Sequence, residues 1–267
     1  MKRFLRPLRD AVARTAVQFG RAVASDDGWA RIGYDLGVPT MRSGLIELRR
    51  RGAVLRRVVD GGACLGHWTV LCKSVYPDAK VLMLEPQVRH RQALEAVCGR
   101  YAPDVRIESV LLGASDADSV AFNVMDDSSG GTGSSVFPEN SEVARHVERL
   151  AMVTLDGLLE STGFGSPDLI KLDVQGYELE VLKGATMALQ SAAFVLLEVS
   201  TWQYNQGSPL IDEVLHWMRD AGFMAFDVVE LSRRHDGQLV QVDILFARRD
   251  GSWCRDQFSG RGDSLAR

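Results

Sequence analysis

The sequence predicts an α/β protein built on a doubly wound sheet of about seven strands, most of them parallel. From about residue 55, short apolar runs alternate with amphipathic, helix-like segments, the pattern of consecutive βαβ units. A glycine-rich turn follows the first of these runs. The last two runs, 223–229 and 239–247, flank an Asp-Gly turn, which predicts a C-terminal antiparallel hairpin.

Length and composition are those of one large globular domain with short extensions. The chain has 267 residues and a formal net charge of -4, which gives no reason to expect a nucleic acid partner. Its four cysteines lack the spacing of metal or redox motifs, so we expect reduced thiols in a cytoplasmic protein. No apolar run approaches the length of a membrane span, and no cleavable signal pattern is present.

The predicted domain covers 55–249, between a basic helical extension, 1–54, and a flexible polar tail, 250–267. Residues 1–23 have basic side chains and apolar positions at roughly helical spacing. Such an amphipathic helix either packs on the domain or contacts an anionic membrane surface, which would be the inner face of the membrane here. We favour packing on the domain. A second short helix is expected over 43–51.

The glycine-rich turn, Val58 to Thr69, ends the first predicted strand. Asp60 stands directly before the turn, and Ala63 takes the place of the middle glycine of a dinucleotide-binding motif. A carboxylate there would repel a pyrophosphate but would suit a cationic amino group. S-adenosylmethionine carries a sulfonium and an ammonium group and no phosphate, so it fits the turn better than a dinucleotide.

A second acidic residue, Glu85, closes the next predicted strand, 81–84. It lies 19 residues beyond Gly66, about the spacing at which an acid meets ribose hydroxyls in such folds. The third predicted strand, 105–112, ends near Asp116, which either meets the adenine amino group or belongs to a simple turn. The full set predicted to hold the cofactor is Asp60, Gly61, Gly62, Ala63, Gly66, Thr69, Glu85, Pro86, Asp116 and Asp173.

The remaining elements follow in order along the chain. Helices are expected over 69–75 and 89–101, and a short strand over 119–124 precedes a flexible loop, 126–135, that is a candidate lid. After a strand at 151–155, Asp156 is the expected cap of a helix at 157–161. Then come a strand at 168–174, one helix at 177–190, a strand at 194–199 and a helix at 209–221.

Two carboxylates, Asp173 and Glu198, end the fourth and fifth predicted strands. Strand ends that face a cofactor are where acceptor chemistry takes place, so the pair is predicted to be catalytic. Either both residues hold Mg²⁺ or another divalent cation, or Asp173 acts alone as a general base. The structural alternatives are a helix cap for Asp173 and a buried ion pair for Glu198.

Other side chains have weaker claims to a role. His67, just past the turn, either faces the reacting groups or is a packed histidine. Trp202 and Tyr204 either stack on a sugar ring or form a core edge. Asp168 and Glu178 are predicted to be surface charges.

Several of these motifs together resemble the FkbM family of methyltransferases. The resemblance covers about 58–197 and rests on three segments in the family's order: Asp60-x-Gly62-x-x-x-Gly66, Glu85-Pro86, and the long signature from Ile170 to Ala185. The chain departs from the family at Gln175, where the family usually has Glu, so no carboxylate acts at that position.

The resemblance implies the Rossmann-like methyltransferase fold, S-adenosylmethionine as methyl donor, and O-methylation. The implied acceptor is a small molecule or glycan: a hydroxyl on a glycolipid, polysaccharide or glycosylated metabolite. An NAD-type oxidoreductase and a non-catalytic binding module are the alternatives, and intact Gly62 and Glu85 disfavour the second. The oligomeric state is open, with a homodimer among the options.

Overall fold

The computed structural model describes residues 38–126, 133–140 and 144–251. The predicted N-terminal amphipathic helix, most of the loop expected over 126–135 and nearly all of the C-terminal tail lie outside these residues. Within them, no helix has the length and apolar character needed to cross a membrane.

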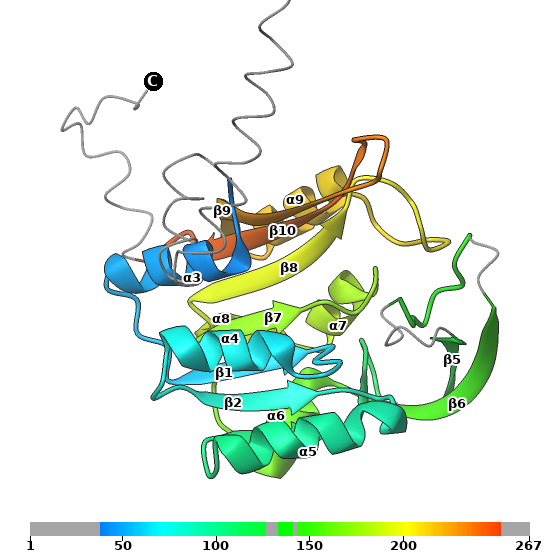
Figure 1. The fold of residues 1–267 in the computed structure, drawn as a ribbon, viewed down its shortest axis with the longest axis horizontal. Helices are drawn as coiled ribbons and strands as arrows, with labels where there is room; N and C mark the ends of the chain where they lie inside the picture. Colours follow the sequence, from blue (N-terminus) through cyan, green and yellow to red (C-terminus); the bar gives the residue numbers. More distant parts are fainter. Residues whose placement is uncertain (1–37, 127–132, 141–143, 252–267) are drawn as a thin grey trace, which may run out of the picture.

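A seven-stranded sheet forms the centre of the molecule, in the order β3-β2-β1-β7-β8-β10-β9 (Figure 1). Strands β1, β2, β3, β7 and β8 pair in parallel, and β10 is antiparallel to both of its neighbours. This confirms the predicted doubly wound sheet and its C-terminal antiparallel hairpin. The strands are β1 (Arg57–Gly61), β2 (Lys80–Leu84), β3 (Val105–Glu108), β7 (Leu169–Leu172), β8 (Phe194–Ser200), β9 (Phe223–Arg233) and β10 (Leu239–Arg248).

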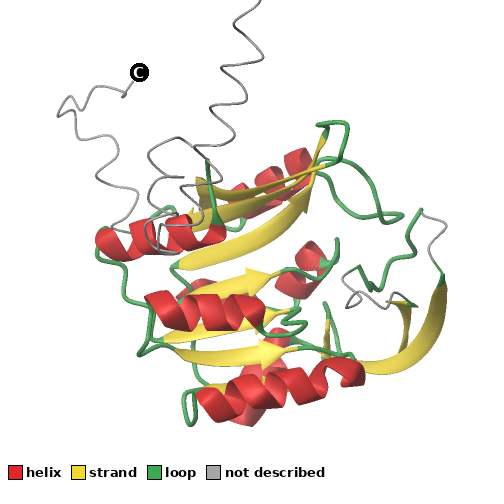
Figure 2. Cartoon of the chain, in the orientation of Figure 1, coloured by secondary structure: helices red, strands yellow, loops and turns green. Residues whose placement is uncertain are grey.

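Helices cover both faces of this sheet (Figure 2). Neighbouring residues of a strand point to opposite faces, so Val58 belongs to one hydrophobic cluster and Val59 to the other, and both are fully buried. One cluster packs under α3 (Met41–Arg50), α4 (His67–Val75) and α5 (Arg91–Arg100), the last preceded by a 3₁₀ turn (Val88–His90). The other packs under α6 (Leu155–Thr162), α7 (Glu178–Lys183), α8 (Thr186–Ser191) and α9 (Ile211–Asp220).

A second, three-stranded sheet was not predicted. It consists of β4 (Leu111–Leu112), β6 (Arg145–Val153) and β5 (Ala117–Met125), in that order. The single strand expected over 105–112 is therefore wrong: its first part pairs with β2, and its last two residues leave to pair with β6. The apolar alternation continues through both parts while the pairing partner changes, so the sequence pattern alone hides the break.

The single helix expected over 177–190 is also wrong, because it divides into α7 and α8 at Gly184. A Cβ on Gly184 would lie 2.2 Å from the carbonyl oxygen of Gly113, so this close approach requires glycine. The expected cap of α6 is corrected as well. Thr154 caps that helix, while the carboxylate of Asp156 accepts hydrogen bonds from the first-turn amides of α8.

Candidate active site

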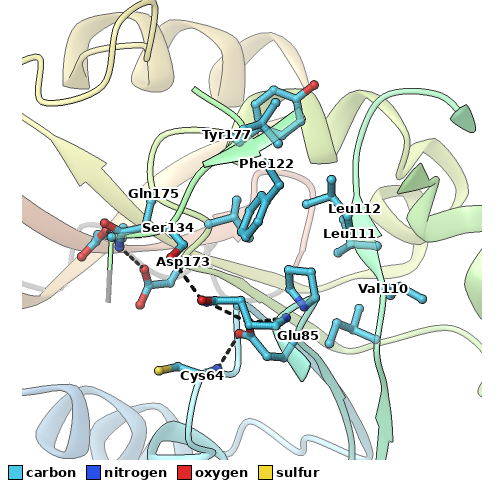
Figure 3. Close-up of a pocket in the computed structure, with 18 residues that line it drawn as sticks. Cys64, Glu85, Val110, Leu111, Leu112, Phe122, Ser134, Asp173, Gln175 and Tyr177 are labelled. Carbon is cyan, nitrogen blue, oxygen red and sulfur yellow. Dashed lines mark hydrogen bonds between the residues drawn. The ribbon is translucent and has the colours of Figure 1, made fainter. Parts of the chain in front are cut away.

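A cavity of about 200 Å³ opens at the carboxyl ends of β1, β2 and β7 (Figure 3). The strand order reverses between β1 and β7, and this switch point is where open α/β sheets bind their ligands. Apolar side chains of the small sheet, including Leu111, Leu112 and Phe122, form one wall. Among the described residues that line the cavity, the charged ones are all acidic: Glu85, Asp173 and Glu198.

The glycine-rich turn brings the ends of three strands together. The amide of Gly62 donates to the carbonyl of Leu84 on β2, at 2.9 Å. Gly62 has a φ of +71°, and a Cβ on it would lie 1.9 Å from the carbonyl oxygen of Asp173. Only glycine combines that backbone conformation with so close an approach, so the turn places Asp173 directly beside the first strand end.

Glu85 lies at the end of β2, as predicted, and faces the cavity (Figure 3). It is buried, and backbone amides on both sides fix its carboxylate. One oxygen accepts from the Cys64 amide at 2.9 Å, and the other accepts from the amide of Gln87 at 3.0 Å. Pro86 also lines the cavity. Nε2 of Gln87 also donates to the second oxygen, at 3.2 Å. The side chain is therefore held rigidly, and the first oxygen, Oε2, keeps a lone pair for a hydroxyl donor.

Asp60 does not reach the cavity, which corrects the expectation that it meets a ligand's ammonium group directly. It is 0% exposed, and its Oδ2 accepts from the hydroxyl of Thr69 at 2.7 Å. Its Oδ1 lies 3.2 Å from Nζ of the buried Lys171. Asp60 and Thr69 thus lie beneath the turn, facing the protein interior, and support it from there.

Asp173 and Glu198 both line the cavity, and the side-chain amide of Gln175, which the sequence did not indicate as a site residue, joins them. Nε2 of Gln175 donates to Asp173 Oδ1 and to Glu198 Oε2, at 2.9 Å in each case. The carboxylates therefore share one neutral donor, and Asp173 is not a helix cap. In the sequence, only the departure from the family pattern at position 175, Gln in place of Glu, points to this bridging amide.

Gln175 itself is fixed by its backbone. Its φ of +56° is unusual for a residue with a side chain, so other contacts must offset the strain. Its carbonyl accepts from the hydroxyl of Ser135 at 2.9 Å and from Nδ2 of Asn205 at 2.6 Å. Ser135 is the last residue of the loop expected over 126–135, and Asn205 follows β8, so three segments converge on this one peptide.

The electrostatics of the two carboxylates differ. Burial raises the pKa of Glu198 well above its ordinary value of 4.5, and the charges of Asp173, Glu178 and Asp243 raise it further. Asp173 instead has Oδ2 at 3.6 Å from the Lys171 ammonium. Burial disfavours that ammonium, but Asp60 and Asp173 outweigh this effect and raise the pKa of Lys171. The raised pKa makes Glu198 a stronger base than an ordinary glutamate.

We expect Asp243→Asn to stabilise the protein in a pH-dependent way. Burial, and then repulsion from Asp173, raise the pKa of Asp243 from 3.8 to about 7. The folded state therefore favours the protonated form, and stability is lost as the pH rises through that pKa. Thermal unfolding at pH 8 should show a melting temperature roughly 2–4 °C above wild type, about 1 kcal/mol for a domain of this size. At pH 4 the two proteins should be similar, and an equal gain at both pH values would contradict the prediction.

Two more predicted site residues lie elsewhere. His67 is exposed at the start of α4 and is not among the residues lining the cavity. Asp116 is also outside the lining, and its carboxylate accepts from the Thr154 amide at 2.8 Å. Of its two expected roles, the structural one in a turn therefore fits better than contact with the adenine amino group. Of the remaining turn residues, Gly61 and Ala63 are buried in the backbone of the turn, and Gly66 begins α4.

The expected surface charges also have structural roles. Asp168 accepts from the amides of Arg56 and Arg57, which joins β7 to the start of β1. Glu178 is 3% exposed and accepts from the amides of Val174 and Gly176, so its expected place on the surface is wrong. Burial, only partly opposed by these hydrogen bonds, raises the pKa of Glu178 to about 7.

The described residues contain no group of three or more His, Cys, Asp and Glu side chains suited to a metal ion. The predicted metal pair, Asp173 and Glu198, has the amide group of Gln175 between its carboxylates. An amide nitrogen is a hydrogen-bond donor and does not ligate Mg²⁺, so this arrangement suits proton chemistry.

Two curated proteins match parts of this chain. The hexuronic acid methyltransferase AglP of Haloferax volcanii is 54% identical over 44 residues, covering 16% of this chain and 18% of that protein. The AMB antimetabolite synthetase AmbE of Pseudomonas aeruginosa is 27% identical over 220 residues, covering 70% of this chain. That match covers 10% of AmbE, so the chain spans a small part of both curated relatives.

The crystal structure of a putative O-methyltransferase from Klebsiella pneumoniae shares the fold. It superposes with a TM-score of 0.50 at 13% identity, over 86% of this chain and 94% of that one. A family model described as the methyltransferase FkbM domain matches residues 60–224, more than half of the chain. The chain therefore belongs to the FkbM family of methyltransferases.

Proposed function

We propose that the protein is an S-adenosylmethionine-dependent O-methyltransferase that modifies a hydroxyl group of a sugar. The observation that carries the proposal is the charge of the cavity: its charged lining, within the described residues, consists of Glu85, Asp173 and Glu198. A cavity with this charge favours a cofactor with a sulfonium and an ammonium group, and it disfavours the pyrophosphate of NAD.

The residues of the cavity fit S-adenosylmethionine. Glu85 offers rigidly held acceptor oxygens at the end of β2, which suits ribose hydroxyls. The apolar wall of Leu111, Leu112 and Phe122 suits the flat adenine ring. When bound, the cofactor supplies a methyl group on a positively charged sulfur, which an oxygen nucleophile can take.

The other acidic residues of the cavity can prepare the acceptor. A sugar hydroxyl is a weak nucleophile, so its proton must be removed as the oxygen is methylated. We assign Glu198 as the proton acceptor, because burial and neighbouring carboxylates raise its pKa and so make it a stronger base. Asp173 and Gln175 orient Glu198, and Lys171 offsets part of the charge of Asp173.

The most specific part of the proposal is that the acceptor is a sugar. It is supported by the likeness to a protein named as a hexuronic acid methyltransferase and by the polar residues around Gln175. A glycolipid, a polysaccharide or a glycosylated metabolite would each present such a hydroxyl.

Calorimetric titration with S-adenosylhomocysteine, run beside NAD, tests the cofactor. We expect the wild type to bind S-adenosylhomocysteine and not NAD. Glu85→Gln should weaken binding of S-adenosylhomocysteine by roughly 10- to 100-fold, which corresponds to the free energy that hydrogen bonds to a charged acceptor usually contribute. Arg91→Ala, an exposed change on α5, is the matched control and should bind normally. Binding of NAD, or no binding of S-adenosylhomocysteine by a folded wild type, would contradict the proposal.

A further inference from the structure

A second cavity, of about 200 Å³, adjoins the first on the far side of Gln175. Gly133 and Gln175 line both cavities, so the two spaces meet at the amide that joins the catalytic carboxylates. The second cavity has a different character. Its other lining residues are mostly polar: Met125, Glu139, Ser200, Tyr204, Asn205 and Gln241.

The floor of this second cavity is one face of the sheet. Ser200 lies two residues beyond Glu198 on β8, so both side chains point to the same side. In the register of β8 with β10, Gln241 is opposite Ser200 and Asp243 is opposite Glu198. Ser200 and Gln241 therefore continue the polar surface that begins at the proposed base.

Two loops, 133–140 and 204–206, form the walls. They are paired through a β-bridge between Glu139 and Asn205, and the Asn140 amide donates to the Tyr204 carbonyl at 2.9 Å. Asn205 is 5% exposed, and its Oδ1 has no hydrogen-bond partner among the described residues. A buried amide oxygen without a donor is costly, and a ligand hydroxyl in the cavity would satisfy it.

The charged and aromatic residues in and around the second cavity indicate which class of ligand it suits. The single charged residue among the described lining is Glu139, and Arg145 neutralises it in a partly buried ion pair. The acidic pair, Asp173 and Glu198, lies next to the cavity, so an anion would be repelled there. At the rim, the ring of Tyr204 packs edge-on against Trp202, with centroids 5.2 Å apart, and offers an apolar face to a pyranose ring.

We propose that this second cavity is the acceptor site, and that it takes an uncharged, polyhydroxylated sugar in preference to a uronic acid. The inference rests on the proposed function and deepens it by naming the acceptor class. Ser200, Asn205 and Gln241 bind hydroxyl groups of the sugar, and one further hydroxyl is directed towards Glu198. This chain thus differs in acceptor from a protein that methylates a hexuronic acid.

Binding of matched glycosides tests the inference. The protein, first loaded with S-adenosylhomocysteine, is titrated with the methyl glycosides of glucose, galactose and mannose and with their uronic acid counterparts, and saturation-transfer NMR reports contact. We expect at least one neutral glycoside to bind about tenfold more tightly than its uronate. Gln241→Ala and Tyr204→Ala should each weaken that binding about tenfold, as for one lost contact. Gln238→Ala, an exposed change of the same residue type in the adjoining hairpin, is the control.

A charge change gives an independent readout. Gln241→Arg places a cation in the cavity, so we expect it to shift the preference towards the uronate by about tenfold. The inference is overturned if no neutral glycoside binds the loaded protein, if the uronates bind better to the wild type, or if the cavity variants behave like Gln238→Ala. Failure to load S-adenosylhomocysteine would instead overturn the proposed function, so the two failures are distinguishable.

Discussion

Glu198→Gln is expected to lower methyl transfer by roughly 10²–10⁴-fold, the usual contribution of a positioned general base. The change keeps the shape and a hydrogen-bonding group but removes the proton acceptor. Affinity for S-adenosylhomocysteine should stay near the wild-type value, because Glu85, the residue proposed to hold the cofactor, is untouched. Calorimetry measures that affinity, and transfer of a labelled methyl group to a sugar acceptor measures the rate.

The pH dependence separates a base from a merely structural residue. Glu198 acts only when deprotonated, and its pKa is raised well above 4.5, so the wild-type rate should rise with pH, with an apparent pKa well above that of an ordinary glutamate. This rise of the rate with pH should be absent from the residual activity of Glu198→Gln. The control variant Glu160→Gln, an exposed change on α6, should keep both the wild-type rate and its pH dependence. A Glu198→Gln enzyme with the wild-type rate and profile would show that another group takes the proton.

The sheet was largely predictable from the sequence, because each buried strand is an apolar run bounded by glycine, proline or a charge. The elements that were missed involve partners distant in the sequence. Leu111 and Leu112 continue an alternating pattern, but they pair with β6, some 40 residues away. Gly184 ends a helix because the backbone of Gly113 approaches it, which no local pattern reveals.

The site was predictable at the level of strand ends. Glu85, Asp173 and Glu198 were placed at one edge of the sheet by the rule for parallel strands, and all three line the cavity. The same rule does not say in which direction each side chain points. Asp60 occupies a strand-end position like the others, yet its side chain points into the interior towards Lys171. Gln175 depends on a left-handed backbone held by Ser135 and Asn205, two remote residues.

Asp60→Ala should destabilise the folded protein by about 3 kcal/mol, the lower end of the usual cost of removing one partner of a buried ion pair, because Asp173 still lies 3.6 Å from the Lys171 ammonium. The Lys171 ammonium is buried and lies 3.2 Å from Asp60, and Thr69 would also lose the acceptor of its hydroxyl. Denaturant unfolding measures the loss. Below the transition, the remaining folded protein should still bind S-adenosylhomocysteine, because the Asp60 side chain does not line the cavity.

A double variant provides the control for this interpretation. If the cost arises from the ammonium that has lost the nearer of its two carboxylates, then adding Lys171→Met to Asp60→Ala should recover part of the lost stability, because an apolar chain of similar length replaces the buried charge. Asp60→Ala with wild-type stability but greatly reduced affinity for S-adenosylhomocysteine would show the opposite, that the carboxylate acts on the ligand. The two variants therefore decide whether the acid before the glycine turn binds the cofactor or supports the turn from beneath, and the burial of Asp60 favours support.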